Sequence, residues 1–384
     1  MVDGTHRLEF TGHRPTLPDT ERILQELVRA GRIPVSESIL SMALPSPVAR
    51  SWDRVEGMLL GLAIGDALGN TSEGMMPAGR RRRHGEVRDY LPNRQAGGRA
   101  VGLPSDDTQL AFWTLEQLIE DGGYVPGNVA RRLASGRIFG IGSAVREFVD
   151  RTLTQGLPWE EAGVASAGNG ALMRIAPILV PHLRAPSSRL WADAALATMT
   201  THNDAAAISA AVAFVAVLWD LMAMSVTPDP AWWLARFSEV ADRLEPAGSR
   251  YQVRGGSFVG FNGRFAVFVR VRVNDAWRRE LDVLTACNEW YSGAYLLETM
   301  PSVLYILMRH GDDPEEAIVR AVNDTKDNDT VAAIVGAAVG ALHGSAAFPA
   351  RWRGGLLGRT REDDDGRVFQ LIERAQLFRP PTAS

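Results

Sequence analysis

Two apolar segments far apart in the chain carry glycine at every fourth position. The first runs from Arg54 to Gly69, and the second from Val331 to His343. An interior glycine destabilises a helix by about 1 kcal/mol relative to alanine, so a stripe of glycines on one helix face requires a packing reason. The close approach of another backbone supplies that reason. We therefore predict two core helices that pack against each other. The glycines concerned are Gly57, Gly61, Gly65 and Gly69 in the first helix, and Gly336, Gly340 and Gly344 in the second.

The rest of the chain is also mostly helical in pattern. Asp106 to Asp121 has amphipathic spacing, and Ala205 to Trp219 is apolar enough to form a buried helix. Apolar residues from Phe258 to Val273 instead alternate or cluster around a turn at residues 260–263, which is typical of a hairpin. A hydrophobic content of 46% suffices for a sizeable core. The predicted fold class is all-α, with a small β-hairpin insertion at about residues 250–274.

Residues 1–50 differ in pattern from the chain that follows. Asp19 to Ala30 has helical spacing, and a second, shorter helix is predicted from Ser36 to Met42. Prolines at positions 45 and 47 then interrupt the backbone. We interpret residues 1–50 as an N-terminal arm and residues 51–384 as the main domain.

Charge and cysteine content argue against several classes of protein. A net charge of −4 gives no electrostatic reason to expect a nucleic acid or a membrane as partner. The apolar run from Ala205 to Trp219 is too short to span a bilayer. The single Cys287 can form neither an internal disulfide nor a thiolate metal site. Since the chain begins without the pattern of a signal peptide, we expect a cytoplasmic protein.

Two polar segments place neighbouring carboxylates at predicted helix starts. Ser105–Thr108 opens the amphipathic helix, and Asp327–Thr330 opens the second glycine-striped helix. One acidic residue is enough to cap a helix, so two at each start favour a further role over capping alone. Carboxylate and hydroxyl oxygens are the ligands of hard cations. Brought together, the two segments would form an oxygen-only site for one or two Mg²⁺ or Mn²⁺ ions. Without metal, their carboxylates would repel each other and shift toward protonation.

Five motifs occur in a fixed order along the chain. They are Gly65–Gly69, Ser105–Thr108, Gly168–Arg174, Thr201–Asp204 and Asp327–Thr330. With these motifs the chain resembles the ADP-ribosylglycohydrolases, relatives of the enzyme that removes ADP-ribose from dinitrogenase reductase, over roughly residues 52–345. No single motif is decisive, but five in order are specific. The resemblance implies a compact, single-domain all-α fold of orthogonal helices with a two-metal centre.

The resemblance also implies a ligand set for two Mg²⁺ ions, with Mn²⁺ as an alternative. Ser105 stands where the family commonly has threonine, and its hydroxyl can still coordinate. Thr325 and Lys326 replace a Gly-Gly pair of the family, and this lysine could weaken metal binding or contact a substrate phosphate. The implied metal ligands are Ser105, Asp106, Asp107, Asp327, Asp329 and Thr330.

The activity implied is hydrolysis of the glycosidic bond at the distal ribose of ADP-ribose, with a carboxylate taking a proton from water. Asp107 and Glu73 are the candidate bases. The loop Gly168-Asn169-Gly170 would offer N–H groups to the pyrophosphate. His202 would add a phosphate contact, and Tyr295 would stack on the adenine.

Each of these residues also has a purely structural interpretation. Glu73 fits a surface loop, the glycine loop a plain turn, His202 a cap or the core, and Tyr295 ordinary packing. Asp66 is equally compatible with structural hydrogen bonds to neighbouring loops. Arg80–Arg83, in an expected long loop at residues 79–102, indicates a solvated basic segment more than a phosphate contact.

Three functions compete. The leading hypothesis is a metal-dependent hydrolase of ADP-ribosylated protein, with arginine the first choice of linkage. The alternative is an immunity protein that binds and occludes an ADP-ribosyltransferase toxin through residues 1–50, with or without hydrolase activity. A Mg²⁺-dependent phosphohydrolase that uses the same carboxylates is third, because no phosphate-loop lysine motif is present.

Overall fold

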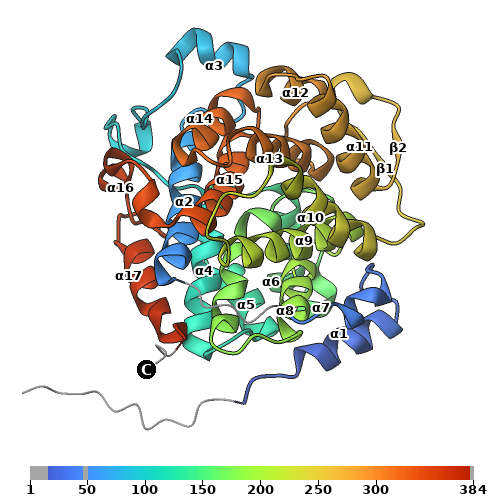
Figure 1. Cartoon of the computed structure of the whole chain (residues 1–384). Helices are drawn as coiled ribbons and strands as arrows, with labels where there is room; N and C mark the ends of the chain where they lie inside the picture. Colours follow the sequence, from blue (N-terminus) through green and yellow to red (C-terminus); the bar gives the residue numbers. More distant parts are fainter. Residues whose placement is uncertain (1–15, 46–50, 381–384) are drawn as a thin grey trace, which may run out of the picture.

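The computed structural model of the chain describes residues 16–45 and 51–380, and it is almost entirely helical (Figure 1). The predicted all-α class is therefore confirmed. The α-helices are α1 (Thr20–Arg29), α2 (Trp52–Asn70), α3 (Pro77–His84), α4 (Asp106–Asp121), α5 (Pro126–Leu133), α6 (Ser143–Leu153), α7 (Trp159–Ala162), α8 (Arg189–Met199), α9 (Ala205–Leu221), α10 (Pro230–Leu244), α11 (Phe265–Arg278), α12 (Val283–Glu289), α13 (Leu296–His310), α14 (Pro314–Asp324), α15 (Asn328–His343), α16 (Ala350–Gly355) and α17 (Arg367–Arg374). Short 3₁₀ helices are η1 (Glu37–Ser41), η2 (Arg94–Ala96), η3 (Leu172–Arg174), η4 (Ala176–Leu183), η5 (Gly256–Phe258), η6 (Ser345–Ala347) and η7 (Ala375–Phe378).

Helices α2 and α15 are the two glycine-striped helices, and they lie side by side as predicted (Figure 1). They run antiparallel, since Gly57 faces Gly340 and Gly69 faces Asp329. A Cβ at Gly57 would lie 2.5 Å from the carbonyl oxygen of Gly340, and a Cβ at Gly65 would collide with that of Ala332. The backbones thus touch directly, and the C-terminal end of α2 meets the N-terminal end of α15.

Other helices enclose this pair on the remaining sides. Helix α15 also contacts α14, α13, α9 and α4. The predicted buried helix is α9, in which every residue except Asp220 is buried. No helix in the described ranges is long and apolar enough to cross a membrane.

The predicted β insertion is present but much shorter than expected. Strand β1 (Tyr251–Gln252) pairs antiparallel with β2 (Asn262–Gly263), with Tyr251 opposite Gly263. The stretch from Phe265 to Val273, which we expected to be strand, is instead the start of α11, so that part of the prediction is wrong.

The error in α11 comes from a pattern that fits two periods. Its valines alternate, but Phe265, Phe268, Val269 and Val273 are buried and follow helical spacing. The Glu245 carboxylate accepts hydrogen bonds from the N–H groups of Phe265 and Ala266, both at 2.8 Å, which satisfies the first turn of the helix. Tertiary capping by a distant residue thus favours the helix.

The segment expected to be a loop at residues 79–102 also begins with helix. Pro77 starts α3, where its fixed φ and missing N–H suit the first helical position. The following run of arginines consists of good helix formers. Arg80 is fully buried, whereas Arg81, Arg82 and Arg83 are exposed. The predicted solvated basic segment is therefore correct for three of the four arginines.

The N-terminal arm packs on the body of the protein wherever it is described. Thr20 Oγ1 donates to Asp193 of α8 at 2.5 Å, and the Leu244 carbonyl accepts from Ser36 N–H at 2.9 Å. The buried apolar residues of the arm are Leu24, Leu27, Val28, Ile33, Val35 and Ile39. This packing occupies the apolar side of the arm and so gives no support to toxin binding, although residues 1–15 and 46–50 lie outside the described ranges.

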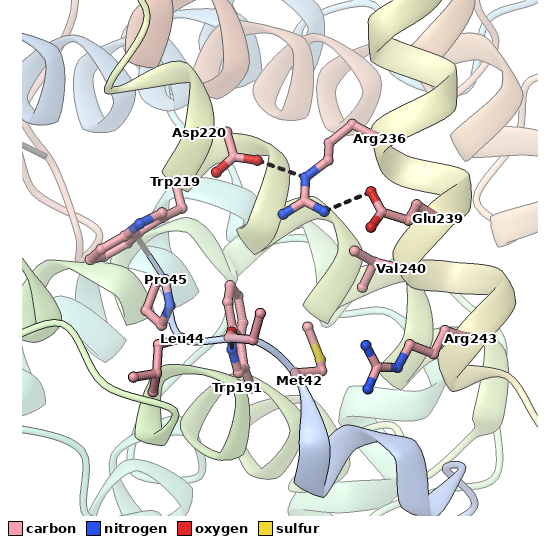
Figure 2. A pocket seen from close by; sticks show the side chains of 11 residues that line it. Met42, Leu44, Pro45, Trp191, Trp219, Asp220, Arg236, Glu239, Val240 and Arg243 are labelled. Atoms are coloured by element: carbon pink, nitrogen blue, oxygen red, sulfur yellow. Dashed lines mark hydrogen bonds and ion pairs between the residues drawn. The ribbon is translucent and has the colours of Figure 1, made fainter. Parts of the chain in front are cut away.

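A small pocket of about 250 Å³ lies where the described arm ends, against α8, α9 and α10 (Figure 2). Trp191 donates its indole N–H to the Ala43 carbonyl at 2.9 Å. Arg236 pairs with Asp220 at 2.6 Å and with Glu239 at 3.0 Å, as the dashed lines in Figure 2 indicate. The arm is therefore held at both ends of its described length.

Candidate metal centre and active site

The two predicted carboxylate clusters meet where α2 ends and α4 and α15 begin. One oxygen each from Asp66, Asp107 and Asp329 lies within 4.8 Å of the other two. A second set with the same spacing consists of Glu73, Asp327 and Asp329. The two triads share Asp329, so these carboxylates form one connected cluster that could hold a metal ion.

Asp107 lies between two hydroxyl groups. Its Oδ2 accepts from Ser105 Oγ at 3.3 Å and from Thr330 Oγ1 at 3.4 Å. Its Oδ1 is buried and has no hydrogen-bond partner among the described residues. A buried carboxylate oxygen without a partner is costly, and a bound cation would satisfy it. The residues present therefore fit a divalent metal ion.

Asp66 combines both of its alternative roles. Its carboxylate accepts from Ser105 N–H at 2.9 Å and from Thr108 N–H at 3.0 Å, which caps α4 from α2. Thr108 Oγ1 adds a bond of 2.5 Å. Asp66 also belongs to the first carboxylate triad, although it was not among the predicted ligands. The available signal was one carboxylate within an apolar glycine-striped helix.

Asp106 lies outside both carboxylate triads. Its Oδ1 approaches Gly140, where a Cβ would be 3.1 Å away. Partial burial and the neighbouring Asp66, Glu73 and Asp327 charges raise the pKa of Asp106 to about 8. Among the carboxylates implied as ligands by the resemblance, it is thus the one that the structure does not bring into a triad.

The glycine loop contacts the second carboxylate cluster through Asn169. The Asn169 amide donates to Asp327 Oδ2 at 2.6 Å and to Thr299 Oγ1 at 3.1 Å. Two of the N–H groups expected to face a pyrophosphate are already bonded within the protein, since Gly168 N–H donates to Ser166 Oγ and Asn169 N–H donates to the Ala294 carbonyl. The loop is therefore anchored to the carboxylates by a side chain.

His202 is buried behind this loop. Its Nδ1 lies 2.9 Å from Thr201 Oγ1, and a Cβ at Gly170 would be 3.0 Å from its ring. Burial and the nearby Arg174 lower the pKa of His202 to about 3, so the imidazole is neutral at pH 7. The ring is placed to support the loop from behind.

Tyr295 is also mostly buried, and one face of its ring is covered. The Arg254 guanidinium lies 4.1 Å above the ring centroid, a cation–π contact. The backbone of Tyr295 bridges to Gly168, which places the ring beside the glycine loop. Arg254 lies just after β1, so the short hairpin brings a cation to this region.

Glu73 is exposed at the rim of the centre. It lines a cavity of about 400 Å³ together with Ser105, Phe139, Gly140 and Arg359, among others. Loss of hydration and the charges of Asp327 and Asp66 raise its pKa. Glu73 is thus the triad carboxylate most accessible to solvent.

Glu298 and Lys326 are further charged groups beside the centre. Glu298 is buried in the first turn of α13, its Oε1 has no partner among the described residues, and burial raises its pKa to about 7. The Lys326 ammonium lies 2.6 Å from the Tyr291 hydroxyl and 4.1 Å from the centre of that ring. Glu298 was not among the predicted site residues, and its signal in the sequence is a single carboxylate in an apolar helix.

Burial and mutual repulsion dominate the electrostatics of the triads. Burial is the largest cause of the raised pKa of Asp107, followed by Asp66 and Asp329. Asp329 is raised by burial, then by Asp327 and Glu73. Each group is therefore costly to ionise unless a cation offsets the charge.

This electrostatic strain predicts a stability that depends on pH in the metal-free protein. The pKa values of Asp106, Asp107 and Asp329 are higher in the folded than in the unfolded state. Their contribution to stability is complete below about pH 4 and is lost as the pH rises through the folded values. We expect the Tm in EDTA to fall from about pH 5 to about pH 8.

Saturating Mg²⁺ should flatten this dependence, because a bound cation favours the ionised carboxylates. Thermal unfolding across this pH range, with EDTA or with Mg²⁺, measures the effect. An Asp107→Asn variant should show a smaller slope in EDTA. A metal-free protein that gains stability over the same range would contradict the assignment.

The site is thus a cluster of buried carboxylates that converge from three helix ends in an all-helical domain and could bind hard cations. Comparison with known proteins gives the family. A sequence model described as ADP-ribosylglycohydrolase matches residues 47–379. The chain belongs to the ADP-ribosylglycohydrolase family, and it is an enzyme of that family.

Individual relatives agree with this assignment. The chain is 32% identical over 315 residues to an uncharacterized protein of Archaeoglobus fulgidus, covering 80% of this chain and 92% of that protein. It is 27% identical to the ADP-ribosylarginine hydrolase Tri1 of Pseudomonas putida, over 79% of this chain and 74% of Tri1. It is 24% identical to the ADP-ribosyl-[dinitrogen reductase] glycohydrolase of Rhodospirillum rubrum, over 85% of this chain and 97% of that enzyme.

A solved structure described as an ADP-ribosylglycohydrolase-related protein complex superposes with a TM-score of 0.62. It shares 28% identity with the chain and covers 84% of this chain and 98% of its own. The resemblance drawn from the five motifs is thus confirmed.

Proposed function

We propose that the protein hydrolyses the glycosidic bond between ADP-ribose and an arginine side chain of a modified protein, and that it requires a divalent cation. The observation that carries this proposal is the pair of carboxylate triads that share Asp329. The likeness to Tri1, an ADP-ribosylarginine hydrolase, supports the arginine linkage. Reversal of protein ADP-ribosylation is then the biological role.

The cation would be held by Asp66, Asp107 and Asp329 in one position, and by Asp327, Asp329 and Glu73 in the other, with Ser105 and Thr330 hydroxyls close by. Mg²⁺ is our first choice, and Mn²⁺ would fit the same oxygen ligands. Such an ion would supply Lewis acidity to substrate oxygens. Asp106, outside the triads, has a supporting electrostatic role in this proposal.

The two candidate bases differ in access to water. Asp107 is buried between two hydroxyls, whereas Glu73 faces the cavity of about 400 Å³. The raised pKa of Glu73 makes it a stronger base than an ordinary glutamate. We therefore assign proton abstraction from water to Glu73, in addition to its contact with the cation, and a ligand role alone to Asp107. The surrounding carboxylates would stabilise the positive charge that builds on the ribose.

Recognition of the ADP moiety would use the glycine loop and Tyr295. Gly168 and Gly170 pack closely against His202, which holds the loop beside the carboxylates, while Asn169 fixes Asp327. His202 supports the loop in this proposal, and its neutral ring suits a position without direct phosphate contact. Adenine would extend the existing stack of Arg254 on Tyr295 or replace the guanidinium.

The decisive test is ADP-ribose release from an arginine-ADP-ribosylated protein in Mg²⁺, with and without EDTA. We expect release in Mg²⁺ and a fall of at least about 100-fold in EDTA, because the carboxylates alone repel each other. A serine-linked substrate serves as the comparison for linkage. Release of AMP in place of ADP-ribose would instead identify a phosphohydrolase, and equal rates with EDTA would reject the metal requirement.

A further inference from the structure

Arg80 is a fully buried arginine whose five guanidinium N–H groups all donate to acceptors in the loop before α3 and at the end of α14 with the loop that follows it. Nε donates to Ser72 Oγ at 3.0 Å, and Nη2 donates to the carbonyls of Ser72 at 3.4 Å and Met75 at 2.9 Å. Nη1 donates to the carbonyls of Asn323 at 3.3 Å and Thr325 at 2.8 Å. Since each acceptor is neutral, these bonds orient the cation without neutralising it.

The two loops held by Arg80 carry two of the three carboxylates of the second triad. Residues 71–76 join α2 to α3 and contain Glu73. Residues 325–327 join α14 to α15 and contain Asp327. A second tie runs in parallel, because Asn328 donates to Ser72 Oγ and to the Gly69 carbonyl, both at 3.1 Å. Ser72 Oγ is thus shared by Arg80 and Asn328.

The charge of Arg80 is matched to its surroundings at longer range. Burial lowers its pKa to about 10, while the carboxylates of Asp329 and Asp324 act in the opposite direction. The guanidinium therefore stays charged at pH 7 behind the carboxylates. A buried cation there reduces the repulsion among the acidic groups and fixes the loops that carry them.

We propose that Arg80 is a positioning residue of the carboxylate centre, holding Glu73 and Asp327 at the separation that a divalent cation requires. This inference deepens the proposed function and rests on its metal requirement. Residues that orient metal ligands commonly contribute about 10- to 100-fold to metal affinity, and we expect Arg80 to contribute about as much.

The test is the affinity of the full-length protein for Mn²⁺, measured by electron paramagnetic resonance and by calorimetry. Arg80→Lys keeps the charge but cannot form the forked contacts to both loops. We expect this variant to bind Mn²⁺ about 10- to 100-fold more weakly. Arg82→Met, on the exposed side of the same helix, should bind within about twofold of the unsubstituted protein, since surface changes rarely matter.

Thermal unfolding distinguishes positioning from general support of the fold. If Arg80 positions the ligands, the rise in Tm on adding Mn²⁺ shrinks in Arg80→Lys. If Arg80 serves only the fold, Tm falls equally with and without Mn²⁺ and the affinity is unchanged, which would overturn the inference. Ser72→Ala retains the arginine but removes the shared hydroxyl, and it should also weaken Mn²⁺ binding. This variant replaces Arg80→Lys if Arg80→Lys fails to fold.

The outcomes also separate this inference from the proposed function. An unsubstituted protein that takes up no Mn²⁺ would overturn both. Unchanged affinity in Arg80→Lys and Ser72→Ala, beside normal binding by the unsubstituted protein, would overturn the positioning role alone.

Discussion

The Asp107→Ala/Asp329→Ala double variant is expected to lose ADP-ribose release by a factor of at least about 10³ and yet to remain folded. Each substitution removes a member of the first triad, and Asp329 also belongs to the second. A metal ion at such a site contributes several kcal/mol of transition-state stabilisation, and each 1.4 kcal/mol is about tenfold in rate. Measurement of kcat/KM at saturating Mg²⁺ tests the loss.

The fold should survive because the two carboxylates repel each other in the metal-free protein. Burial and neighbouring charges raise the pKa of both groups, so their removal relieves repulsion. We expect the double variant to have a Tm in EDTA equal to or above that of the unsubstituted protein, and to gain nothing from Mg²⁺. Asp312→Ala, an exposed carboxylate on the turn before α14, is the matched control. Full activity in a folded double variant would remove the proposed mechanism.

The Gly65→Ala variant should be the most destabilised of the single-methyl changes in α2. The added Cβ would collide with the Ala332 carbonyl oxygen, and it would also meet the backbone nitrogen of Ala333 at 2.8 Å. Overpacking a core usually costs about 1–3 kcal/mol, and contact with backbone leaves no flexible side chain to yield. We expect a net loss of about 3 kcal/mol or more in the free energy of unfolding. The clash outweighs the roughly 1 kcal/mol by which alanine stabilises a helix relative to glycine.

Gly354→Ala is the control for this experiment. Gly354 lies in α16, is exposed, and has no heavy atom within 4 Å of a Cβ built on it. There the same change should be neutral or should stabilise by up to about 1 kcal/mol. Urea unfolding of both variants in EDTA measures the change in the free energy of unfolding, which should be negative for Gly65→Ala and zero or positive for Gly354→Ala. Equal stability of Gly65→Ala and the unsubstituted protein would show that the helices can separate at no cost.

Sequence reasoning succeeded where a local pattern had one physical explanation. Glycine at every fourth position admits a helix–helix contact and little else, and α2 packs on α15 as predicted. Paired carboxylates at helix starts exceed the needs of capping, and Asp107 meets Asp329 in one triad. Both predictions depend on spacing within a single segment, which the sequence displays directly.

Reasoning from the sequence failed where distant residues decide the outcome. The valines of α11 fit both strand and helix, and the capping carboxylate of Glu245 is supplied by another element. Arg80 is indistinguishable in the sequence from Arg81, yet only the tertiary structure encloses it among carbonyl groups. The Arg254 cover on Tyr295 likewise depends on where the hairpin folds back. None of these contacts leaves a local signature.

The pairing of α2 with α15 also fixes when the protein can acquire its centre during synthesis. Helix α2 ends at Asn70, whereas α15 ends at His343, and the bond from Asn328 to Ser72 spans 256 residues. A ribosome adding about 5–20 residues per second leaves α2 without its partner for roughly tens of seconds. During that interval the glycine face of α2 lacks α15, the helix that it packs against in the folded protein. Both triads include Asp329, so nascent chains that stop before α15 cannot form either of them.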